Sequence, residues 1–275
     1  MALSIEITRL LPLYPRGVYL QWDLLNPTES GDYTFDIYRA GSPEGPWTEL
    51  LIQTLNRYNY NDVLPITGTP VDGDPNQLSL VRGIFYRIVA TSPSLLARVE
   101  VVSAVEPRLD GRQRLLKRKF LRDAGVMLRK LNGVEVAVCK RMHWGPRCTK
   151  CWDATTKQVV RSNCATCLGT GFVPGYFDPV LTLGRRGTLP SAKQLSPQGV
   201  AEYRATQVTL LDLPKVEIDD VLVFLKDNRR FVVKSVIQTE LRTVAVHQKL
   251  EISEIARSSP EYRIVVDPTR IPPLF

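Results

Sequence analysis

The sequence predicts a mainly β protein built from several small modules. Short stretches that alternate apolar and polar residues, bounded by Gly, Pro, Ser and Asp, recur near both ends of the chain, and one segment between them has helical spacing. The chain has 275 residues, of which 44% are hydrophobic, so it is long and apolar enough for two or three domains with packed cores. We therefore expect an N-terminal β-sandwich, a short basic helix, a zinc-knuckle insert, and a C-terminal small β-barrel with an extended arm and tail.

Residues 1–106 are expected to form the sandwich. The stretch VYLQWDL at 18–24 alternates apolar with polar side chains, which is typical of a half-buried strand. Further strands are expected at 33–40, 82–91 and 97–105. Trp22, Trp47 and Tyr86 are then core residues rather than parts of a ligand site. We expect this segment to have a core of its own and to fold alone.

Three stretches of this segment resemble a fibronectin type III domain. They are VYLQW near the start, FDIYRAGSPEGPW in the middle, and FYRIVA before the last strand. The resemblance implies a sandwich fold. It implies no particular activity, because this sandwich is a general spacer and adhesion module.

Residues 107–133 are expected to form a basic amphipathic helix that links the sandwich to the rest of the chain. Asp110 is a suitable N-cap residue. The docked face is predicted by apolar residues at helical spacing, which are Leu116, Phe120, Ala124, Met127 and Leu131.

The same helix carries the densest run of cations in the chain. Its candidate contacts to an acidic partner or to DNA are Arg114, Lys117, Arg118, Lys119 and Arg122. The alternative is that these cations form only the solvated face of a helix that is docked by its apolar stripe.

Residues 134–178 contain two Cys-x-x-Cys pairs, and we expect them to form a zinc-binding segment. The candidate ligands are Cys148, Cys151, Cys164 and Cys167. Four thiolates match the ligand set of a closed structural zinc site. The residues between the two pairs are enough for a short hairpin, and the glycines in CLGTG permit a turn in which backbone N–H groups approach the sulfurs.

Other uses of the four cysteines remain open. An iron ion held by four thiolates has the same spacing. Two disulfides would require an oxidising compartment, and a redox pair would be expected to open a helix beside a βαβ unit. A site filled by four thiolates has no position for water, so we expect a structural brace. Cys139 is expected to be a buried small hydrophobe, and His143 could only replace one of the sulfurs.

Residues 179–275 are expected to form a β-barrel-like module. Alternating strands fill 205–256, with a hairpin turn at KDNRR, and so many strands in a short segment favour a small barrel. The stretch 183–199 is rich in Gly, Pro and Ser and is expected to be a long loop. The proline-rich tail 267–275 is expected to lie extended on a neighbour.

The formal net charge of +8 and the pI of about 9.3 predict an acidic partner. No apolar run approaches the roughly 18 residues of a membrane helix, and the N-terminus lacks a signal-peptide pattern. The sequence also lacks a P-loop, a dinucleotide fingerprint and a Gly-x-Ser-x-Gly motif. We therefore do not expect an enzyme.

The C-terminal half resembles the neck proteins of tailed bacteriophages, which complete the head or connect it to the tail. The resemblance spans 145–265 and lies in DDVL, NRRFVV and VAVHQKLEI, with GTGFVPGYFDP after the cysteines resembling inserts in phage virion proteins. It implies a barrel with extended arms that forms a homo-oligomeric ring around the DNA channel. The implied location is the virion, assembled in the host cytoplasm.

The partners implied by this resemblance are further copies of the chain, other neck, portal or tail proteins, and genomic DNA in the channel. Two alternatives remain. One is a zinc-dependent nucleic-acid-binding protein, and the other is a structural protein of the baseplate.

Overall fold

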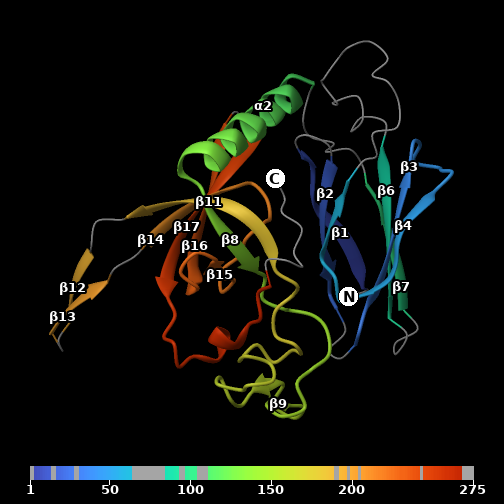
Figure 1. Ribbon diagram of the computed structural model, residues 1–275. Helices are drawn as coiled ribbons and strands as arrows, with labels where there is room; N and C mark the ends of the chain where they lie inside the picture. The colour runs from blue at the N-terminus through green and yellow to red at the C-terminus, as the bar shows by residue number, and fades with distance from the viewer. Residues whose placement is uncertain are drawn as a thin grey trace.

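The computed structural model confirms a mainly β protein, and its described residues include one short α-helix and a closed six-stranded barrel. Two β bodies lie beside each other, with the helix and the cysteine segment on the barrel side (Figure 1). The residues that the structure describes are 3–13, 17–27, 31–63, 84–92, 97–103, 111–188, 192–196, 199–203, 206–241 and 244–267.

The first body is a sandwich of two antiparallel sheets. One sheet has the order β1 (Ser4–Leu13), β2 (Gly17–Leu25) and β5 (Asn59–Asp62), and the other has the order β4 (Thr48–Leu55), β3 (Thr34–Ala40), β6 (Phe85–Ser92) and β7 (Ala97–Val102). The sheets face each other across a core that includes Trp22, Phe35 and Tyr86. The rings of Trp22 and Phe35 lie 5.5 Å apart, so the expected core positions of Trp22 and Tyr86 are confirmed.

The expected core position of Trp47 is wrong. Trp47 is only half-buried, and the guanidinium of Arg87 lies 4.9 Å from the centre of its ring. Arg87 also covers the ring of Tyr38, at 4.6 Å. Trp47 follows a turn rather than lying in a strand, so strand alternation does not direct it inward.

The second body is a barrel with strand order β11-β14-β17-β16-β15-β8. Its strands are β8 (Val134–Cys139), β11 (Val180–Thr188), β14 (Thr206–Leu211), β15 (Val221–Phe224), β16 (Arg229–Leu241) and β17 (Val244–Glu254). The interior is filled by Val, Leu, Ile and Phe side chains, among them Phe224 and Phe231, whose rings lie 5.2 Å apart. The expected turn between β15 and β16 is confirmed, with Asn228 at φ 52°.

The barrel begins earlier in the chain than residue 179. β8 lies in the segment that we assigned to the cysteines, and it closes the barrel by pairing with both β11 and β15. The cysteine segment is therefore an insertion between two barrel strands.

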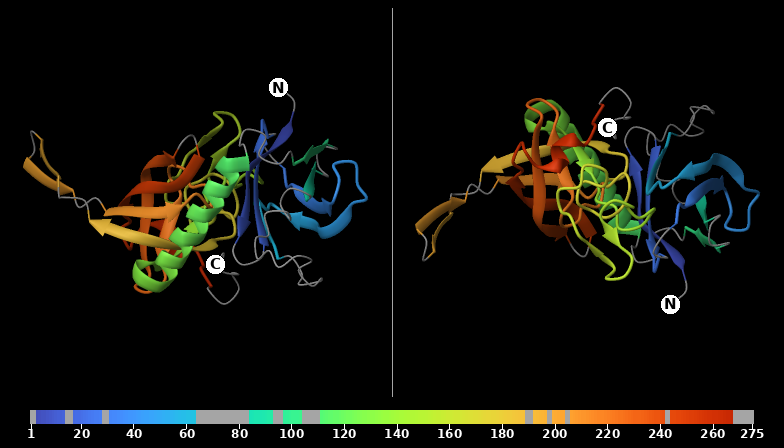
Figure 2. Two further views of the ribbon diagram at one scale, coloured as in Figure 1. Left: turned by 90° about the horizontal axis from the view of Figure 1, so that it is seen from above. Right: turned by 90° about the horizontal axis from the view of Figure 1, so that it is seen from below.

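The expected long loop at 183–199 is wrong. β11 continues to Thr188, and a hairpin of β12 (Ala192–Ser196) and β13 (Gly199–Tyr203) follows. Ser196 and Gly199 are the innermost residue pair of this hairpin, so they mark the ends of strands rather than a loop. We call residues 192–203 the arm, because they project away from the barrel in every view (Figures 1 and 2). Of the expected tail, residues 268–275 lie outside the described part of the chain.

The helix α2 (Gly111–Met127) continues into one π-type turn, η1 (Leu128–Asn132), and lies across the outside of the barrel (Figure 2). Its buried side chains are Lys117, Leu121 and Leu128. Each buried residue comes one position after a residue of the predicted apolar stripe. The docked face is therefore rotated by about 100° around the helix axis from the face that we predicted. The expected N-cap, Asp110, lies outside the described residues.

The core of the sandwich extends into the helix and the cysteine segment, so the expectation that the sandwich has a core of its own is wrong, although the barrel interior remains a separate cluster. Trp144 and Phe177, which flank the cysteines, pack against sandwich aromatics in a single buried cluster. The ring of Trp144 lies 5.5 Å from that of Phe35, and the ring of Phe177 lies 5.0 Å from that of Tyr58. This shared core fixes the cysteine segment against the sandwich as well as the barrel.

Candidate metal centre

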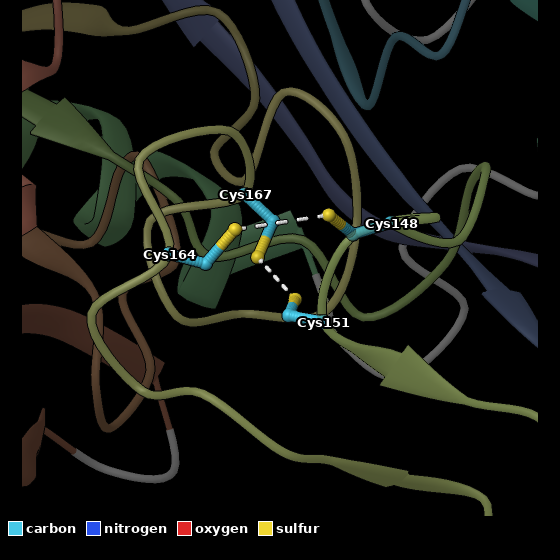
Figure 3. A group of neighbouring side chains, drawn as sticks. All are labelled: Cys148, Cys151, Cys164 and Cys167. Atoms are coloured by element: carbon cyan, nitrogen blue, oxygen red, sulfur yellow. Dashed lines mark hydrogen bonds between the residues drawn. The ribbon is translucent and has the colours of Figure 1, made fainter.

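The four predicted ligand cysteines come together in the structure (Figure 3). Their Sγ atoms all lie within 4.8 Å of one another, with distances of 3.0 Å for Cys151–Cys167 and 3.9 Å for Cys148–Cys164. A tetrahedral zinc with Zn–S bonds of about 2.3 Å separates its sulfurs by roughly 3.8 Å. The four sulfurs therefore have the donor type and the spacing that a tetrathiolate metal site needs.

A short hairpin brings the second pair opposite the first, as predicted. β9 (Trp152–Asp153) pairs with β10 (Gln158–Val159) directly after the first pair of cysteines. Two backbone hydrogen bonds fix the hairpin and the second pair to the first. The N–H of Val160 donates to the carbonyl of Cys151 at 2.8 Å, and the N–H of Cys148 donates to the carbonyl of Gly171 at 2.9 Å.

The glycines after the last cysteine form the turn that the sequence indicated. Gly169 and Gly171 have φ of +81° and +83°, in the left-handed region that favours glycine. A Cβ atom on Gly169 would lie 2.3 Å from the carbonyl oxygen of Ser162, so a side chain cannot fit there. Burial raises the pKa of the Cys167 thiol, and hydrogen bonds from the backbone N–H groups of Gly171 and Gly169 to its sulfur reduce this rise.

Hydrogen bonds shift the pKa values of the cysteine thiols in both directions. Backbone N–H groups of Cys167 and Thr166 lower the pKa of the Cys164 thiol to about 6. Burial raises the pKa of Cys151, and hydrogen bonds to neighbouring thiols raise it further. Buried thiolates need an opposing positive charge, and a bound divalent cation supplies one at the distance of a covalent ligand bond.

An aromatic and cationic stack supports the first cysteine pair from outside. The guanidinium of Arg147 lies 3.7 Å from the centre of the Trp152 ring and 4.0 Å from that of Phe172. Arg147 and Phe172 also form an isolated β-bridge. The stack joins the start of the segment to its end, so it holds the two cysteine pairs together without contributing a ligand.

The remaining cysteine and the two histidines take no part in the cluster. Cys139 is fully buried in β8, as predicted, and burial raises its pKa to about 12. His143 Nε2 lies 2.6 Å from Asp23 Oδ1 on the sandwich, so it joins two modules instead of replacing a sulfur. His247 is half-buried in β17, where burial lowers its pKa.

The cations proposed for the helix do not form one set. Lys117 is buried, and its ammonium lies 3.7 Å from Asp212, whereas Lys119 and Arg122 are exposed. Arg122 pairs with Asp123 at 3.0 Å. The side chains of Arg114 and Arg118 lie outside what the structure describes.

Asp212 is a buried carboxylate where three elements meet, and its role was not predicted from the sequence. It accepts hydrogen bonds from Arg9 of β1 at 3.2 Å and from Gln238 of β16 at 3.0 Å, and it also faces Lys117 of α2. The available signal was a carboxylate directly after the apolar end of β14. That signal identifies no partner, because all three partners are distant in sequence.

The chain has no match among protein-family models or curated protein sequences. In the described part of the chain, no helix has the length and apolar character needed to cross a membrane.

Proposed function

We propose that this chain is a structural protein of a tailed-bacteriophage virion, and that it forms a ring at the head–tail junction. In this role it links the portal side to the tail and carries out no catalysis. Its partners are further copies of itself, other neck, portal or tail proteins, and genomic DNA in the channel. The proposal rests on the sequence resemblance of 145–265 together with the architecture described above.

The arm is the observation that supports the proposal most directly. A hairpin of two strands is only marginally stable in water when nothing packs against it. The barrel that carries the arm is closed and therefore offers no free edge to a neighbour. An arm that projects from such a body serves to contact another subunit, as the extended arms of a ring protein do.

The other modules suit a particle protein. The sandwich with three strands in one sheet and four in the other supports the expected likeness to fibronectin type III domains, which act as spacers. The cysteine segment has little regular structure of its own, so a metal would hold its shape. The surplus of positive charge suits contact with DNA or an acidic ring.

The metal is proposed to be one structural zinc per chain, held by the four cysteines. Elemental analysis of freshly purified protein should give zinc and chain in equal amounts. Cys148→Ser should lower the zinc content, whereas Cys139→Ser should leave it unchanged because Cys139 lies in β8 outside the cluster. Iron in place of zinc would identify the alternative metal, and no metal with four reactive thiols would contradict the proposal.

Assembly is tested by the mass of the purified protein in solution and by images of the particles. We expect closed rings from the intact chain. Replacing residues 189–205 with a short Gly-Ser linker should leave the barrel folded and weaken the ring. Rings that form equally well without the arm would remove the main support for the proposal, and images of the parent particle would separate the neck from the baseplate.

A zinc-dependent nucleic-acid-binding protein is the second candidate. It is favoured by the helix 111–132, which carries eight Lys or Arg residues and a single carboxylate. Tight binding of free duplex DNA by a monomer, with sequence preference and a steep salt dependence, would support this candidate over the neck protein.

A further inference from the structure

The helix α2 and the turn η1 expose apolar side chains on a surface that the barrel does not cover. Phe120, Met127 and Leu131 are 36%, 53% and 75% exposed. Phe120 and Met127 are two helical turns apart and therefore lie on the same side of α2. The three residues belong to the face that the sequence pattern predicted to be docked, and we call them the apolar stripe.

The apolar stripe is available because a different side of the helix holds it to the barrel. Leu121 and Leu128 are buried there, and Lys117 points inward to Asp212. One side of the helix therefore packs on the barrel, and an adjacent side with large apolar residues faces solvent. Exposed apolar residues at helical spacing are typical of a helix that binds a partner.

The charges around the apolar stripe indicate the character of that partner. Lys119, Arg122, Arg129 and Lys130 are all exposed. The sole carboxylate of 111–132 is Asp123, which pairs with Arg122. Lys119 and Lys130 lie about a quarter turn from the apolar stripe along one side, whereas Arg122 and Arg129 lie on the opposite side of the helix. The surface is therefore apolar with one cationic edge, and it complements a segment with apolar side chains and with Asp or Glu along one side.

This combination distinguishes between classes of partner. The same surface of a second copy would place cations against cations, which opposes pairing of two α2 helices. Phosphate contacts need the cations but gain nothing from Phe120 or Leu131. A helix that inserts into a lipid surface presents a broad apolar face, and here the second apolar side is already buried on the barrel.

We propose that α2 and η1 bind an acidic amphipathic segment of a different protein, with the apolar stripe as the centre of the contact. The inference rests on the proposed function for where that protein lies, since an adjoining virion protein would supply the segment. It does not depend on how the chain assembles with itself, because the arm lies on a separate part of the molecule (Figure 1).

The test uses intact protein and a display library of random peptides of about 16 residues, a length that covers most of α2. We expect the selected peptides to combine Asp or Glu with Leu, Ile or Phe. The triple variant Phe120→Ser, Met127→Ser, Leu131→Ser should weaken their binding at least about tenfold, because central apolar anchors dominate such contacts. The variant Lys119→Glu, Lys130→Glu should weaken binding in a salt-dependent way.

Matched controls come from the barrel. Ile237 is 53% exposed on β16, and Lys249 is exposed on β17. Ile237→Ser and Lys249→Glu should leave peptide binding unchanged. Circular dichroism and thermal unfolding should show that all variants fold, since every substituted side chain is exposed.

Three results would overturn the inference. Selected peptides that are acidic but bind the triple serine variant normally would show that only charge is recognised, as in phosphate binding. Equal loss in the barrel controls would place the contact elsewhere. Peptide binding without ring formation would keep this inference and contradict the proposed neck role, whereas ring formation without the expected peptides would do the reverse.

Discussion

At the scale of single residues, the buried charges and the aromatics between modules determine how the parts are held together. Asp220 is buried directly before β15 and accepts hydrogen bonds from the backbone N–H groups of Arg141 and Glu217, each at 2.8 Å. Burial raises its pKa to about 6, although the nearby Lys140 ammonium opposes this effect. The folded protein therefore binds a proton at Asp220 more tightly than the unfolded chain does.

Asp220 should make stability depend on pH below neutrality. Its pKa in the folded protein lies above the ordinary value of 3.8, so the folded state binds the proton more tightly. The contribution of Asp220 to stability is then fully present below about pH 3.8 and is lost as the pH rises through about 6, a change of about 2–3 kcal/mol that is complete near pH 7. Urea unfolding of the wild type and of Asp220→Asn, measured from pH 4 to pH 7, checks this.

The difference between the two proteins isolates Asp220. Asp23 and Glu217 have lowered pKa values and act in the opposite direction, but both proteins contain them. We expect the free energy of unfolding of the wild type to fall relative to that of Asp220→Asn as the pH rises. Above about pH 7 the difference between the two proteins should stay constant. A constant difference across this range would show that Asp220 has an ordinary pKa.

Trp144 is the aromatic residue that joins the cysteine segment to the sandwich. It is fully buried, its ring lies 4.6 Å from that of Phe177, and its indole N–H donates to Asp23 at 3.2 Å. Trp144→Ala should lower the free energy of unfolding by about 3–5 kcal/mol. Trp47→Ala is the control and should cost far less, since Trp47 is half-exposed. Equal losses in urea unfolding would contradict this assignment.

At the scale of elements, local patterns predicted the strands and the metal ligands, and long-range contacts decided what remained. Alternation located β2 and β3, and the spacing of the cysteines identified the whole cluster, because both signals lie within a few residues. The docked side of α2 could not be predicted in this way. Lys117 is buried because Asp212 lies opposite it, 95 residues later in the chain.

The local sequence pattern also could not show that β8 belongs to the barrel. Its apolar run VEVAVC fits a buried strand in any sheet, and only pairing with β11 and β15 makes it part of the barrel. The hairpin of the arm was missed for the opposite reason. Its Gly, Pro and Ser residues suggested a loop, whereas the backbone pairs from Ala192–Tyr203 to Ser196–Gly199.

Removing the proposed zinc should destabilise more than the cysteine segment. Phe172 follows the last ligand and belongs to the buried cluster that also contains sandwich residues. Chelation, or Cys148→Ser, should therefore lower the melting temperature of the whole chain and increase proteolysis within 145–175. Cys139→Ser with chelator absent is the control. An unchanged main transition with a separate low-temperature step would show that the segment melts independently.

At the scale of the whole molecule, the sandwich and the barrel are joined by contacts of several kinds. Gln21 is buried and exchanges hydrogen bonds with the backbone of Lys215. Arg9 reaches Asp212, and His143 reaches Asp23. Polar and aromatic contacts thus cross the same boundary, which favours one cooperative unit over two independent domains.

The joint core predicts how the two halves behave when separated. A fragment of residues 107–275 would expose Trp144 and Phe177, which the sandwich covers in the intact chain. Exposing two such side chains should cost about 3–6 kcal/mol, so this fragment should melt at a lower temperature and bind a hydrophobic dye. Adding a separately prepared fragment of residues 1–106 should restore the melting temperature and suppress the dye signal. A fragment 107–275 that melts like the intact chain would show that the shared core contributes little, and that the modules are independent after all.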